Sequence, residues 1–75
     1  MDEMYVDTDH GVYDVLAVRE SDEAPDGATH AVFHESGSLA GFAAANGWAW
    51  NASGALLPSS HTLAGAVTAV AESDA

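Results

Sequence analysis

The front of the chain alternates apolar and polar residues in the manner of β-strands. Residues 4–6 (MYV) and 12–19 (VYDVLAVR) are rich in β-branched and aromatic side chains, and the turn-forming segment 7–11 (DTDHG) separates them. The two segments therefore predict a β-hairpin. In residues 12–19 both alternating sets include apolar side chains, so we expect this strand to be covered on at least part of both faces.

A third strand is predicted over residues 29–34 (THAVFH), which have a similar composition. The segment before it, residues 20–28, is charged and contains Pro25 and Gly27, which are typical of a loop. The front of the chain thus predicts three strands in a mostly antiparallel sheet.

In the middle of the chain the apolar residues are spaced differently. Apolar residues recur at helical intervals over residues 38–46, and a serine at position 36 or 38 can cap the first turn. Asn46-Gly47 is a typical left-handed stop for a helix. We therefore expect a helix of about two turns at 38–46, too short to be stable without packing.

A small hairpin is predicted next. Residues 48–50 (WAW) and 55–57 (ALL) flank the turn-forming segment 51–54 (NASG), and Pro58 ends the second strand. Because side chains on a strand alternate between its two faces, the two tryptophans share one face of this hairpin.

A last helix is predicted from a cap at Ser59 or Ser60 through Ala71, with residues 72–75 frayed. The whole pattern predicts one small α+β domain over residues 1–75 in the order β-β-β-α-β-β-α. Its mostly antiparallel sheet would have three to five strands and pack with two helices.

Two segments resemble a known family. Residues 7–18 (DTDHGVYDVLAV) are similar to the opening hairpin of the small YegP-like domains, and residues 59–70 (SSHTLAGAVTAV) are similar to their closing helix. The helix expected at 38–46 has no counterpart in that family. The resemblance implies a small α+β fold and assigns no role to any residue.

The charge of the chain favours a particular environment. Twelve acids stand against one base, for a formal net charge of −11, and lysine and cysteine do not occur. Such self-repulsion opposes compaction in dilute buffer, but at 1 M salt the Debye length is only about 3 Å. With 48% hydrophobic residues the chain is too apolar for a disordered tail. The composition resembles that of proteins from extremely halophilic archaea.

The same composition argues against several classes of function. Phosphate contacts need Lys and Arg, so direct nucleic-acid binding is not expected, and an anionic membrane surface would repel the chain. No apolar run is long enough for a membrane span and the start shows no signal peptide, so we expect a cytoplasmic protein. Ser60 and His61 are adjacent without a nucleophile motif, so we expect neither an enzyme nor a cofactor.

Histidines provide one alternative function. His30 and His34 share one face of the strand predicted at 29–34, and Glu35 follows them. Imidazoles and carboxylates are common metal ligands, but the two Cα atoms would be about 13 Å apart on a strand. A metal-binding module using these three residues is therefore one alternative. An acidic mimic of nucleic acid, which would bind a partner protein, is another.

The longest charge-free segment indicates the function that we expect. No Asp, Glu, Lys or Arg occurs from Ser36 to Ala71, and the cores of protein interfaces are depleted in charge and enriched in aromatic residues. We expect a non-catalytic interaction module that self-associates, most simply as a dimer, with a larger protein as a further possible partner. The expected apolar anchors are Phe42, Trp48, Trp50, Leu56 and Leu57.

Overall fold

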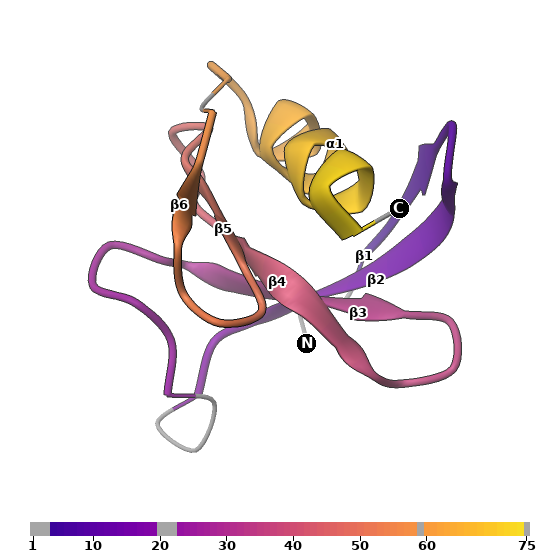
Figure 1. Cartoon of the computed structure of the whole chain (residues 1–75), viewed down its shortest axis with the longest axis horizontal. Coiled ribbons are helices and arrows are strands. Elements are labelled where there is room, and N and C mark those ends of the chain that lie inside the picture. The colour runs from indigo at the N-terminus through magenta and orange to yellow at the C-terminus, as the bar shows by residue number, and fades with distance from the viewer. Residues whose placement is uncertain (1–3, 20–22, 59, 75) are drawn as a thin grey trace.

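Among the residues that the structure describes, six antiparallel strands lie in the sheet in the same order as in the sequence, and one helix follows them (Figure 1). The computed structural model describes residues 4–19, 23–58 and 60–74. The result is a small α+β domain with one sheet. Its elements are β1 (Met4–Thr8), β2 (Gly11–Ala17), β3 (His30–His34), β4 (Leu39–Ala43), β5 (Ala49–Asn51), β6 (Leu56–Leu57) and α1 (Leu63–Asp74).

The helix α1 covers one face of the sheet. Figure 1 shows the sheet curving around it, with β1 and β2 on one side and β5 and β6 on the other. The core on this face consists of small and medium side chains from both layers. Its fully buried members include Val15 and Val32 from the sheet and Val67 and Val70 from the helix. Such side chains let the two layers approach closely.

Both predicted hairpins are confirmed. In the first, β1 pairs with β2, and the hydroxyl of Thr8 donates a hydrogen bond to the carbonyl oxygen of Gly11 (2.8 Å) across the turn. In the second, β5 pairs with β6. Its turn is organised by Asn51, whose Oδ1 accepts hydrogen bonds from the backbone N–H groups of Ser53 (3.0 Å) and Ala55 (2.9 Å). The turn formers in the sequence therefore have the expected role.

The helix predicted at 38–46 is wrong, because this segment contains the strand β4. The turn before it is closed by the N–H of His34, which donates to the carbonyl oxygen of Ser38 (2.8 Å). The strand β4 then pairs with β3 on one side and β5 on the other. These ladder hydrogen bonds and the burial of residues 40–43 outweigh the weak preference of a two-turn helix with a glycine inside it.

The Asn46-Gly47 signal marks a turn between strands, not the end of a helix. Gly47 has a φ of 101°, in the left-handed region that glycine adopts readily. Its N–H donates to the carbonyl oxygen of Ala44 (2.9 Å), and the N–H of Ala44 donates to that of Trp48 (2.8 Å). A left-handed glycine closes hairpins as well as helices, so the sequence identified the turn but not the elements that it joins.

The final helix is confirmed, with a different cap from the one predicted. The hydroxyl of Thr62 accepts a hydrogen bond from the N–H of Gly65 (3.0 Å), which is the geometry of an N-cap. Of the predicted caps, Ser59 lies outside the described residues, and Ser60 precedes the helix without capping it. The helix continues through Asp74, so residues 72–74 are helical where the sequence predicted an end at Ala71. No helix among the described residues is long and apolar enough to span a membrane.

Adding a methyl group at Gly41 should destabilise the fold. A Cβ at this position would lie 2.8 Å from Cγ1 of Val70 and would also meet the carbonyl oxygen of Trp50. We expect Gly41→Ala to lower the free energy of unfolding by about 1–3 kcal/mol, as overpacking does elsewhere. Denaturant unfolding followed by tryptophan fluorescence measures the change.

The matched control adds one heavy atom at an exposed site. Ala45 follows β4 and its side chain is exposed, so Ala45→Ser should change the free energy of unfolding by less than about 0.5 kcal/mol. Equal stabilities for the two variants would contradict the close contact between α1 and β4.

Candidate protein-interaction surface

The face of the sheet away from α1 also carries a row of apolar side chains. Val15, Val32 and Gly41 are register partners that face the helix, so the residues that alternate with them face the opposite way. These residues form a row across five paired strands, and the face that they occupy is called the open face below. The row consists of Leu16, Ala31, Phe42, Trp50 and Leu56.

Part of the open face is covered by the loop between β2 and β3. Its Ala24 and Ala28 pack against a cluster that includes Phe42 and Trp50, and a Cβ on Gly27 would lie 3.9 Å from two carbon atoms of the Trp50 ring. Phe42 and Trp50 are only 3% and 5% exposed as a result. The loop therefore builds a second core in the middle of the open face.

The cover ends at the β5–β6 hairpin. Trp48 is 48% exposed and Leu56 is 60% exposed, while the ring of Trp48 leans on that of Trp50 with centroids 6.2 Å apart and planes at 55°. Trp50 and Leu56 are direct register partners on β5 and β6. We call Trp48, Trp50 and Leu56 the aromatic edge. It is a solvent-facing apolar surface on a buried aromatic support.

The five anchors predicted from the sequence have different places in the structure. Trp48 and Leu56 can be reached by another molecule. Phe42 and Trp50 are buried within the domain and support the surface from below. Leu57 is half-buried and packs on the core beneath α1, because it follows Leu56 on β6 and therefore points to the opposite face.

Other apolar side chains on the open face were missed by the sequence prediction. Tyr5 on β1 is 68% exposed, and Phe33 and Leu39 are half-buried at the border of the loop-covered cluster. Leu39 was missed because it was assigned to a helix. The signal that could have found Tyr5 and Phe33 is the presence of apolar residues in both alternating sets of their strands.

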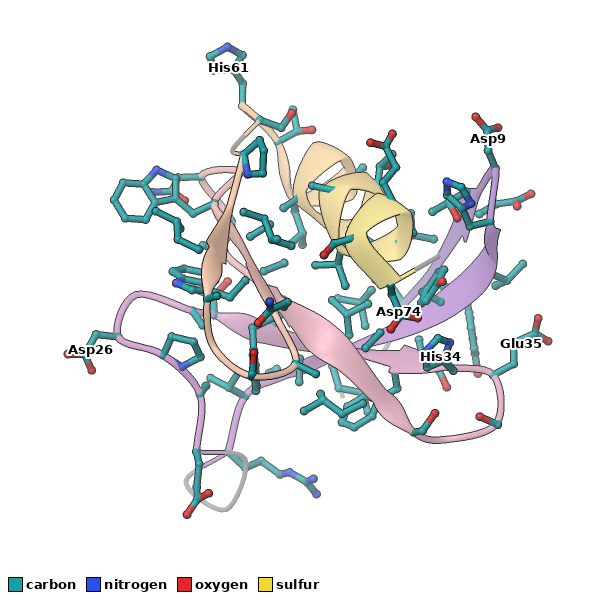
Figure 2. The ribbon with its side chains drawn as sticks, viewed as in Figure 1. Asp9, Asp26, His34, Glu35, His61 and Asp74 are labelled. Atoms are coloured by element: carbon teal, nitrogen blue, oxygen red, sulfur yellow. The ribbon has the colours of Figure 1, made fainter. Side chains whose placement is uncertain are left out.

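The histidines proposed as metal ligands are not brought together. His30 and His34 occupy the two ends of β3. The Nδ1 atom of His30 is 2.7 Å from the hydroxyl of Thr29, and the Nε2 atom of His34 is 2.7 Å from Oδ2 of Asp74. Glu35 projects away from His34 in Figure 2. Among residues 4–19, 23–58 and 60–74 no group of three or more potential ligands could hold a metal ion.

His34 instead takes part in a cluster at the end of α1. Its ring lies 5.3 Å from that of Tyr13, centroid to centroid, and its partner Asp74 belongs to the last turn of the helix. Burial raises the pKa of Tyr13, and the nearby carboxylate of Asp74 raises it further. The His34–Asp74 pair is about one-third exposed, so its contribution to stability is less than about 1 kcal/mol. We interpret the cluster as a contact that positions the helix.

Comparison with known proteins does not assign a family. A scan against protein-family models and searches of the curated proteins and of the solved structures found no match to this chain. The similarity of residues 7–18 and 59–70 to YegP-like domains is therefore unsupported by a family match. The functional proposal rests on the surface itself.

The raised pKa of Tyr13 predicts a loss of stability in alkali. Below about pH 10 the phenol is neutral in both the folded and the unfolded chain. As the pH rises further, the unfolded chain loses its proton first, because the pKa in the folded chain is higher. We therefore expect the free energy of unfolding to decline above about pH 10, and to decline less in Tyr13→Phe. Denaturant unfolding between pH 8 and pH 11 is the measurement.

The exposed phenol of Tyr5 provides the control for this experiment. Tyr5→Phe should show the same alkaline decline as the wild type, because it leaves the buried phenol in place. If Tyr13→Phe also declines as the wild type does, the decline arises elsewhere and the assignment to Tyr13 is wrong.

Proposed function

We propose that this protein is a non-catalytic module that self-associates through the aromatic edge. The observation that supports this proposal most strongly is that Trp48 and Leu56 are exposed and that each adjoins the buried Trp50. Tryptophan is enriched among the residues that contribute most to binding energy in protein interfaces. A buried aromatic support holds such an anchor in one orientation, which lowers the entropy lost on binding.

The distribution of charge favours a second copy of the same chain as the partner. Residues 36–71 contain no charged side chain and include the whole aromatic edge. A basic partner would be attracted to carboxylates, and none belongs to the aromatic edge itself, whereas an uncharged apolar surface is best matched by another uncharged apolar surface. A second copy offers one, and a two-fold axis through the edge would pair it with itself.

The size of the domain sets the extent of such a contact. Interfaces of standard size bury about 800 Å² on each partner, which is close to a fifth of the 4395 Å² accessible surface of this chain. The aromatic edge would be the centre of that area. Its exposed neighbours on the same hairpin, Ala55 and Pro58, are uncharged and extend it.

Adaptation to concentrated salt is the second part of the proposal. It is supported by the formal net charge of −11 and by the position of the acids, since no charged residue among the described ones is buried. Their mutual repulsion is weakened when ions screen it. We therefore propose that the protein folds and associates in concentrated electrolyte.

Removing the exposed anchors should weaken self-association. We expect the variants Trp48→Ser and Leu56→Asn each to raise the dissociation constant of the dimer at least about tenfold, as interface anchors do. Molar mass from light scattering and sedimentation velocity, both in 2–3 M KCl over a range of protein concentrations, are the measurements.

The control for these variants is Tyr5→Ser, which removes a still more exposed aromatic side chain at the far edge of the sheet. Its dissociation constant should equal that of the wild type. A wild-type protein that stays monomeric at millimolar concentration in 3 M KCl would refute self-association. A loss caused equally by Tyr5→Ser would place the contact elsewhere on the open face.

A further inference from the structure

An acidic loop borders the aromatic edge. Residues 19–28 include four carboxylates and one base, Arg19. The contacts of this loop with the Trp50 cluster are made by uncharged residues, namely Ala24, Ala28 and the backbone at Gly27. The side chains of Glu23 and Asp26, which are next to these contacts in the chain, are exposed. The described part of the loop thus places apolar residues against the sheet and the carboxylates of Glu23 and Asp26 in solvent.

The backbone of the loop at Asp26 lies close to Trp50, the buried member of the aromatic edge. Asp26 precedes Gly27, whose Cβ position would be 3.9 Å from the Trp50 ring. Since neighbouring Cα atoms are about 3.8 Å apart, the Cα atom of Asp26 lies within about 10 Å of that ring. When two copies meet at this edge, carboxylates of their loops that come within about 10 Å of each other repel at 0.1 M salt, where the Debye length is about 10 Å, and are screened at 1 M, where it is about 3 Å.

We propose that ionic strength regulates the self-association through this loop, with the carboxylates of Glu23 and Asp26 opposing the contact when salt is low. The inference rests on the self-association proposed above. When two copies meet at the aromatic edge, each brings its loop to the border of the contact, and like charges there repel. Concentrated salt screens this repulsion and leaves the apolar contact unopposed.

The other end of the molecule provides a control of equal charge. Figure 2 shows Asp9 and Asp26 at opposite ends of the domain, whose longest extent is 29 Å. Asp7 and Asp9 are exposed residues of the β1–β2 hairpin. The double variants Glu23→Gln/Asp26→Asn and Asp7→Asn/Asp9→Asn each remove two carboxylates and change the formal net charge from −11 to −9. They differ only in the place from which charge is removed.

The experiment measures the dissociation constant of the dimer by sedimentation velocity. It compares 3 M KCl with the lowest KCl concentration at which circular dichroism shows all three proteins to be folded. At low salt we expect the loop variant to bind roughly threefold or more tightly than the wild type, and the hairpin variant to stay within roughly 1.5-fold of it. In 3 M KCl all three should agree within roughly twofold, because screening removes the difference.

The comparison of the two variants decides the question. Salt also strengthens the burial of apolar surface, so tighter binding of the wild type in KCl does not identify the loop by itself. Equal effects of the two double variants at low salt would show that net charge alone matters and would overturn the inference. A dimer with the same dissociation constant in all three proteins at both salt concentrations would also overturn it and leave the proposed function standing. A wild type that does not associate in 3 M KCl would refute the proposed function itself.

Discussion

A single helix can cover only one face of a six-stranded sheet, and the rest of this structure depends on that constraint. The twelve residues of α1 form a rod about 18 Å long and 10 Å wide, whereas six strands about 4.8 Å apart form a wider layer with two faces. The second face must meet solvent, a loop or another molecule. In this protein it carries a row of apolar side chains from β2 to β6, and exposing that row to water is unfavourable. The loop between β2 and β3 covers its centre, including Trp50, and leaves Trp48 and Leu56 exposed.

The two cores differ in the kind of side chain that they bury. Beneath α1 the core consists largely of alanine and valine, together with Tyr13, because the helix lies close to the sheet at Gly41. The large rings of Phe42 and Trp50 lie in the other core, under the loop. Burial of apolar surface contributes in proportion to area. Much of the stability that comes from burying aromatic rings therefore arises in the core that only the loop covers. A second copy at the aromatic edge would bury more of this apolar surface.

The sequence predicts the hairpins and the last helix because their signals are local. Turn formers and alternation depend on residues a few positions apart, as the Asn51 turn illustrates. The strand β4 could not be predicted in this way, since its stability comes from pairing with two other strands and from the contact of Gly41 with Val70. The candidate site was predicted in part. The charge-free segment indicated Trp48 and Leu56, but the burial of Phe42 depends on a loop that lies far from it in sequence.

The order of the strands explains how a pattern of charge in the sequence becomes a pattern on the surface. Since neighbours in the chain are neighbours in the sheet, the charge-free residues 36–71 form one contiguous side of the domain, made of β4, β5, β6 and most of α1. The acidic front half forms the opposite side through β1 and β2. The β2–β3 loop is the exception, because it belongs to the acidic half in sequence and packs against Trp50 of the neutral half. Through the repulsion of Glu23 and Asp26 in this loop, the ionic strength can therefore alter the strength of a contact made at the aromatic edge.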